Sequence, residues 1–103
     1  MEYTPDTWVK VKIEVEGKPD LFKIVGGWSG GYADGDNWRV NSGVVKTEEF
    51  DDYYLFHGHS GSVYKCYKQS EGVRYSISGV LASMTKSKGA KVTVMGRKKS
   101  WTY

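Results

Sequence analysis

The first clear pattern along the chain is a strict alternation of apolar and charged residues between positions 9 and 16. A period of two places the apolar residues on one face, which is typical of a half-buried β-strand over residues 7–16. These apolar residues are Val9, Val11, Ile13 and Val15. Residues 16–20, with Gly17 and Pro19, are typical of a turn, so residues 21–28 are expected to return as the second strand of a hairpin.

Further along, the pattern predicts more strands and one helix. Strand-like runs occupy residues 38–45, 53–59, 62–68, 73–77 and 91–95, and residues 47–52 are expected to form an acidic connection. A helix is predicted over residues 79–88, with Leu81 in its apolar stripe, Ser78 as its cap and Gly89 at its end. We therefore expect an α+β, mainly β fold of about six mostly antiparallel strands, forming a twisted sheet or a small open barrel.

Residues 26–37 interrupt the strands with five glycines and two aromatic residues, Trp28 and Tyr32, and have no strand or helix period. Loops of about twelve residues are uncommon in compact domains and are usually functional or disordered. Since disordered segments are poor in aromatic residues, we expect an ordered loop beside a binding site. A phosphate loop is not predicted, because neither Gly-Lys-Ser/Thr nor the start of a helix follows the glycines.

Composition supports a single domain over residues 1–103, rich in strands and turns. Aromatic residues make up 15% of the chain, and thirteen glycines stand against two prolines. The net charge of +3 is unevenly divided, since residues 1–52 hold eleven acidic and six basic residues whereas residues 53–103 hold one and nine. Such asymmetry favours an anionic partner, but distant strands commonly pair in one sheet, so we expect the charges to mix on the folded surface.

The sequence shows none of the features that are typical of an exported or membrane protein. Its one cysteine, Cys66, cannot form an internal disulfide. No apolar run approaches the ~18 residues of a membrane helix, and residues 1–6 lack the layout of a signal peptide. A cytoplasmic location without a membrane partner is therefore expected.

Arg39 and Asn41 are the first candidates for a binding site. The period of two places a guanidinium and an amide on one face, and together they could hold a carboxylate, a phosphate or the edge of a base. In the alternative interpretation, Arg39 pairs with a local acid such as Asp36 or Glu48, and residues 41–43 form a bulge or turn.

His57 and His59 also share a face, so zinc chelation has to be considered. In a simple hairpin His57 lies opposite Tyr64 and Leu55 lies opposite Cys66, which would bring Cys66 to the same face as a third ligand. The familiar spacings of zinc sites are absent, however, and we expect neither a metal nor a cofactor.

The residue types of a nucleophilic enzyme are present, as Ser60 or Cys66 beside histidines and acids, but their spacing selects no triad and matches no nucleophile elbow. We therefore expect a binding protein rather than an enzyme. The candidate binding residues are Trp28, Tyr32, Trp38, Arg39, Asn41, Ser42, His57, His59, Ser60 and Tyr64. In the tail, the residues that combine basic charge with a stacking surface, as single-strand binders do, are Arg97, Lys98, Lys99 and Trp101. Because termini are often frayed, residues 96–103 are expected instead to form a mobile, solvated tail.

Short motifs spread from Trp8 to Met84 carry a family resemblance. They include residues 38–43 (WRVNSG), 53–56 (YYLF), 60–66 (SGSVYKC) and 79–81 (GVL). In these motifs the chain resembles small uncharacterised accessory proteins of tailed bacteriophages, notably marine ones. The resemblance implies a non-enzymatic protein that binds a host protein, for example as an inhibitor of a defence factor. The alternative that it implies is a binder of a nucleotide or nucleic acid through an aromatic and arginine groove.

Overall fold

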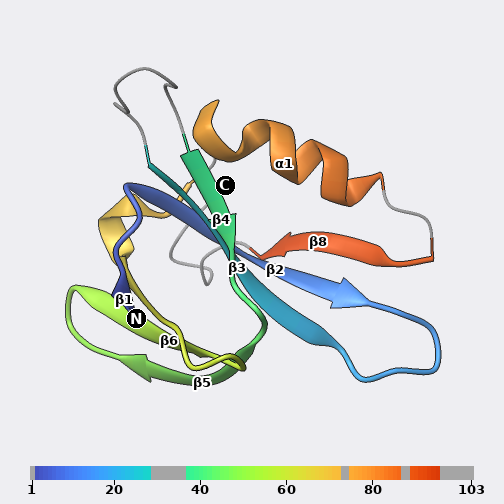
Figure 1. The fold of residues 1–103 in the computed structure, drawn as a ribbon, viewed down its shortest axis with the longest axis horizontal. Helices are drawn as coiled ribbons and strands as arrows, with labels where there is room; N and C mark the ends of the chain where they lie inside the picture. Colours follow the sequence, from blue (N-terminus) through green and yellow to red (C-terminus); the bar gives the residue numbers. More distant parts are fainter. Residues whose placement is uncertain (1, 29–36, 73–74, 87–88, 96–103) are drawn as a thin grey trace.

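The computed structural model describes residues 2–28, 37–72, 75–86 and 89–95. These residues form two four-stranded sheets, one α-helix and one short 3-10 helix (Figure 1). The first sheet has the order β4-β3-β2-β8, with β2 at Thr7–Glu14, β3 at Leu21–Trp28, β4 at Asn37–Val40 and β8 at Lys91–Met95. The second has the order β1-β7-β6-β5, with β1 at Glu2–Tyr3, β5 at Val44–Glu49, β6 at Tyr53–Gly58 and β7 at Val63–Tyr67. The 3-10 helix η1 spans Lys68–Ser70, and the helix α1 spans Tyr75–Thr85.

Apart from the parallel pair β1–β7, the strand pairs within these sheets are antiparallel. This arrangement confirms the expected α+β, mainly β class and the hairpin of β2 and β3. The described strands number eight rather than about six, and they form two sheets and no closed barrel.

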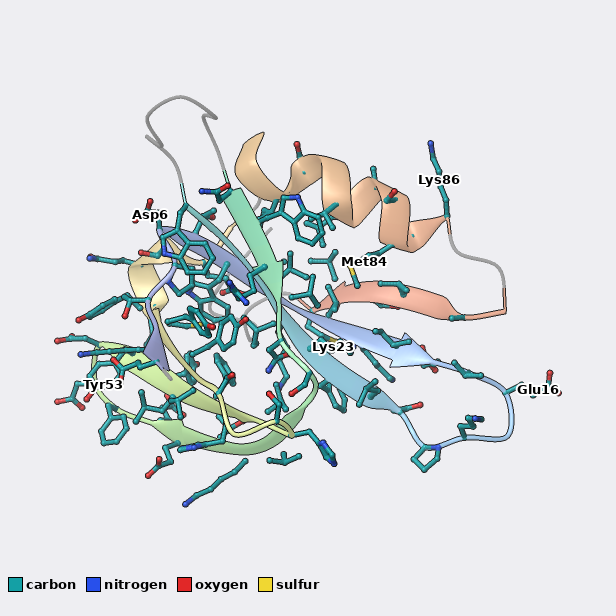
Figure 2. The ribbon with its side chains drawn as sticks, viewed as in Figure 1. Asp6, Glu16, Lys23, Tyr53, Met84 and Lys86 are labelled. Atoms are coloured by element: carbon teal, nitrogen blue, oxygen red, sulfur yellow. The ribbon has the colours of Figure 1, made fainter. Side chains whose placement is uncertain are left out.

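The first sheet is the middle of three layers, with α1 on one side and the second sheet on the other (Figure 1). The alternation in β2 explains how one sheet supports two cores. Val9 and Val11 face α1, where they pack with Ile77 and Leu81, and the half-buried Met84 of α1 joins them (Figure 2). On the opposite face of β2, Trp8 packs against the second sheet. The face that carries lysine and glutamate further along the strand is therefore also buried at its beginning.

The helix differs from the sequence-based prediction, because it begins at Tyr75 instead of residue 79 and ends at Thr85. Residues 75–77 are helical rather than part of the expected strand at 73–77, and Ser78 lies inside the helix instead of capping it. The reason is the spacing of the buried residues, since Ile77 and Leu81 lie four residues apart and share the face that covers the first sheet.

The strand expected over residues 38–45 is split in two. Its first part is β4 in the first sheet and its second part is β5 in the second sheet, with Asn41–Gly43 between them. Gly43 adopts a φ of +131°, which disfavours any residue with a side chain. β5 continues to Glu49, into the segment expected to be a connection. The chain therefore crosses between the sheets at Asn41–Gly43.

Candidate ligand-binding pocket

A pocket of about 300 Å³ lies where the ends of the two sheets meet. It is lined by Tyr3 of β1, Trp28 of β3, and Asn37, Trp38 and Arg39 of β4. Three of these residues, Trp28, Trp38 and Arg39, were candidates from the sequence. β1 belongs to the second sheet and β3 and β4 belong to the first, so the pocket depends on the packing between the sheets.

Residues 4–6, which connect β1 to β2, fix the two sheets against one another at this junction. The indole Nε1 of Trp28 donates a hydrogen bond to the carbonyl oxygen of Thr4 at 3.0 Å, and the amide of Asp6 donates to the carbonyl of Gly27 at 2.9 Å. Gly26 makes room for the buried Pro5, because a Cβ atom at Gly26 would lie 2.9 Å from the Cβ of that proline. Tyr3 is thereby fixed beside the first sheet.

Three side chains, Tyr64, Tyr3 and Arg39, contact one another in sequence from the core beneath the pocket to the surface. The guanidinium of Arg39 lies over the ring of Tyr3, with its Cζ 4.5 Å from the ring centroid. The Tyr3 ring in turn lies 5.1 Å from the buried Tyr64 ring, and Trp28 meets Tyr3 edge-on at 6.3 Å. Tyr64 thus supports the pocket from beneath rather than lining it.

The electrostatics of these side chains follow from burial. Burial raises the pKa of Tyr64 to about 12, although the positive charge of Arg39 acts in the opposite direction. Among the residues that the structure describes, Arg39 forms no ion pair with an acid, and Glu48, one of its two expected partners, pairs with His57. The other, Asp36, lies outside the described residues. Within the described part of the chain, the guanidinium is therefore held by an aromatic ring and not by a carboxylate.

Asn41 does not join Arg39 in a site, contrary to the expectation from their spacing. Its side chain is only 3% exposed, and its Oδ1 accepts a hydrogen bond from the amide of Ile24 at 2.9 Å. Its own amide donates to the carbonyl of Ile24 at 3.0 Å. Asn41 thus pairs twice with β3 at the point where the chain leaves the sheet. The alternative interpretation, with a bulge or turn at residues 41–43, is right only in that the strand is interrupted there, because Asn41–Gly43 form the crossing from β4 to β5.

The candidate serines, Ser42 and Ser60, hydrogen bond to one another and so connect two reversals of the chain. The amide of Ser60 donates to the Oγ of Ser42 at 2.9 Å, and the Oγ of Ser42 donates to the Oγ of Ser60 at 3.2 Å. Beside them, the amide of His59 donates to the carbonyl of Gly43 at 2.8 Å. These hydrogen bonds connect the crossing at Asn41–Gly43 to the turn between β6 and β7. The contacts of the two serines are therefore structural.

The hairpin register considered for a zinc site, with His57 opposite Tyr64 and Leu55 opposite Cys66, is wrong by one residue. His57 lies opposite Val63, and Cys66 lies opposite Tyr54 on the other face. Cys66 is fully buried, and burial raises the pKa of its thiol. His57 lies on the outer face, with its Nε2 2.7 Å from Oε1 of Glu48. The described residues contain no group of three His, Cys, Asp or Glu side chains that could hold a metal ion.

Two lining residues, Tyr3 and Asn37, were not candidates from the sequence. Tyr3 belongs to a strand of two residues, which is too short to show a period, and its only signal was its aromatic ring near Pro5. The candidates Tyr32, Arg97, Lys98, Lys99 and Trp101 lie outside the described residues.

Comparisons with protein-family models, with curated proteins and with solved structures found no match to this chain. Across the described residues, α1 and η1 are both too short to cross a membrane as an apolar helix. Function therefore has to be inferred from the residues of this chain and their geometry.

Proposed function

We propose that this protein is a non-enzymatic binding protein that holds an anionic ligand with a flat ring, of the nucleotide class, in the pocket at the junction of the sheets. The observation that carries the proposal is the guanidinium of Arg39, 4.5 Å from the centre of the Tyr3 ring, in a pocket that Trp28 also lines. It combines the two chemical features that recognise a nucleotide.

Each part of such a ligand finds a suitable group. A guanidinium presents several donors in a fixed plane and binds phosphate oxygens in a bidentate manner. Exposed indole and phenol rings offer faces and edges on which a base can stack, and Trp38 is 55% exposed. The pocket volume of about 300 Å³ lies at the lower end of the range for small-molecule sites. This size fits one mononucleotide better than a dinucleotide.

The arrangement of the remaining polar residues favours binding over catalysis. Ser42 and Ser60 hydrogen bond to one another, Cys66 is buried as a thiol, and His57 pairs with Glu48 on another face. A nucleophile needs a base within hydrogen-bonding distance and an accessible position. The buried free thiol also suits a reducing compartment, so the cytoplasm is part of this proposal.

A thermal-shift screen with mononucleotides and cyclic nucleotides tests the proposal. At a ligand concentration about 100 times the Kd, binding stabilises the folded state by about 2.7 kcal/mol, which for a domain of this size raises the Tm by about 10 °C. Arg39→Ala should abolish this gain. Lys46→Ala is the matched control, since it removes a positive charge at another exposed position, outside the pocket.

Two outcomes would contradict the proposal. Either no nucleotide stabilises the chain, or one does so equally in the Arg39→Ala variant. If instead a single-stranded oligonucleotide binds, with an affinity that falls steeply with salt, the ligand is a nucleic acid. The host-protein partner and the phage-type origin stay predictions, because the pocket itself bears on neither.

A further inference from the structure

The outer face of the second sheet is a separate surface. Because side chains alternate along β6 and β7, the rings that pack into the core, such as Phe56 and Tyr64, leave their neighbours facing outward. The outward side chains are Tyr53, Leu55, His57, Val63, Lys65 and Tyr67. Within the described part of the chain, α1 covers the first sheet and leaves this face uncovered (Figure 1).

Aromatic side chains gather at one end of this face. Phe50 stacks on Tyr53 with ring centroids 4.8 Å apart, and Tyr53 meets the cross-strand Tyr67 at 5.7 Å. The Nζ of Lys65 lies over both tyrosines, at 4.6 Å from Tyr53 and 5.3 Å from Tyr67. Phe50 remains 40% exposed, and Tyr53 lies on the outside of the molecule (Figure 2). Clusters of tyrosine and phenylalanine held in fixed positions are typical of protein interfaces.

A second pocket, of about 360 Å³, adjoins this cluster and is lined by Asp51, Asp52, Tyr67, Lys68 and Gln69. Its one basic residue, Lys68, is already neutralised, because its Nζ lies 2.8 Å from Oε2 of Glu49 and over the ring of Tyr54 at 5.2 Å. The carboxylates of Asp51 and Asp52 form no ion pair with any described residue. An aromatic wall beside two such carboxylates suits a cationic side chain.

The charge of the whole face agrees with a cationic partner. Apart from the ion pair of Lys68 with Glu49, the positive side chains are Lys46 and Lys65, and the negative ones are Glu2, Glu48, Asp51 and Asp52. This excess of negative charge repels the phosphates of a nucleic acid. It attracts a protein surface that carries arginine or lysine.

We propose that the outer face of the second sheet is a docking surface for a protein partner that inserts an arginine or lysine side chain between Asp51, Asp52 and Tyr67. Apolar side chains of the same partner pack on Phe50 and Tyr53. This surface has no lining residue in common with the nucleotide pocket, to which β1 contributes Tyr3, opposite the inward-facing Tyr64.

Selection from a randomised displayed-peptide library, with the full chain as bait, tests this proposal. The selected peptides should be enriched in arginine or lysine next to an apolar residue. Their affinity should fall about five- to tenfold in the double variant Asp51→Asn with Asp52→Asn, which keeps the shape of the pocket and removes its charge. The matched control is Glu14→Gln with Glu16→Gln, which removes the same charge from the β2–β3 hairpin and should leave the affinity unchanged.

Other results would overturn the proposal. Enrichment of acidic peptides, or of peptides that bind the double variant equally well, would show that the pocket accepts no cation. If reversing the charges of Arg97, Lys98 and Lys99 to glutamate in the full chain strengthens peptide binding, the occupant is the chain's own tail and not a separate partner. Arg39→Ala should leave peptide binding intact, which separates this test from that of the nucleotide pocket.

Discussion

The two cores on either side of the first sheet are built from different kinds of side chain. The core under α1 is aliphatic and consists of Val9, Val11, Val25, Ile77 and Leu81. The core between the sheets is largely aromatic and consists of Trp8, Ile24, Phe56, Tyr64 and Cys66. None of these five aliphatic residues has a polar side-chain atom, whereas Trp8 and Tyr64 bring an indole N–H and a hydroxyl into the aromatic core.

This difference explains where the candidate site lies. The aliphatic core is closed by a helix. The aromatic core continues outward, because buried Tyr64 contacts Tyr3 and Tyr3 contacts the exposed Arg39. Aromatic rings with a polar group are suited to such a transition, since one end packs and the other contacts water. The pocket is therefore the point where the aromatic core reaches the surface, and its rigidity depends on that core.

The largest effect is expected for Trp8→Ala, in the aromatic core. Trp8 is 1% exposed, and its Nε1 donates a hydrogen bond to the carbonyl of Tyr67 at 2.7 Å. The substitution leaves a large cavity and a carbonyl without its donor, and should lower the free energy of unfolding by about 3–5 kcal/mol. Urea denaturation measures this change in the free energy of unfolding. Trp8→Phe keeps a ring and loses the hydrogen bond, and it should lower the free energy of unfolding by less than Trp8→Ala. If Trp8→Ala lowers the free energy of unfolding by less than Leu81→Ala does, the aromatic core does not contribute more to stability than the aliphatic core.

Leu81→Ala tests the aliphatic core and should have the next largest effect. Leu81 is 5% exposed and packs between α1 and the first sheet. Its truncation should lower the free energy of unfolding by about 2–4 kcal/mol and leave ligand binding at the Arg39 pocket unchanged, because α1 does not line that pocket. Ser83→Ala, at an exposed position of the same helix, is the control and should be close to neutral.

The two cores also differ in how far they could be predicted from the sequence. The alternation in β2 correctly identified Val9 and Val11 as one buried face. It did not show that Trp8 and Lys10, on the other face, lie against a second sheet. There, burial lowers the pKa of Lys10, and its Nζ lies 5.8 Å from the ring centroid of Phe56 in β6. A local period shows which side chains share a face, but not what covers that face.

The candidate site was predictable in part for the same reason. Trp28 was identified as an aromatic residue of the glycine-rich segment, and Trp38 and Arg39 as part of the polar strand segment that follows it. Arg39 was chosen for the face that it was expected to share with Asn41, although the structure places only Arg39 in the pocket. Tyr3 was missed because its role depends on a contact between strands distant in the sequence. The hairpin register that was considered for a zinc site was wrong by a single residue, and the observed β6–β7 register places Cys66 on the opposite face from His57.

Asn41→Ala should have a smaller effect and tests the crossing between the cores. The substitution removes the acceptor of the Ile24 amide, which is buried, and should lower the free energy of unfolding by about 1–3 kcal/mol. Amide hydrogen exchange at Ile24 should be faster in the variant. Ser42→Ala, which removes an exposed hydroxyl next to Asn41, should lower the free energy of unfolding by less than Asn41→Ala. Equal effects of the two substitutions would show that the crossing does not depend on the Asn41 side chain.

The smallest effect is expected outside both cores, for the pair of Glu48 and His57 on the outer face. A hydrogen bond from His57 holds the pKa of Glu48 below its ordinary value of 4.5. A carboxyl group whose pKa is lowered by folding stabilises the folded state above 4.5, and the stabilisation is lost as the pH falls through the lowered value. The native chain should therefore be slightly more stable than Glu48→Gln above pH 4.5, and this difference should vanish in strong acid. Urea denaturation at a series of pH values measures it. Because the pair is exposed to solvent, a large difference, or one that persists in strong acid, would show that Glu48 acts through packing rather than through its charge.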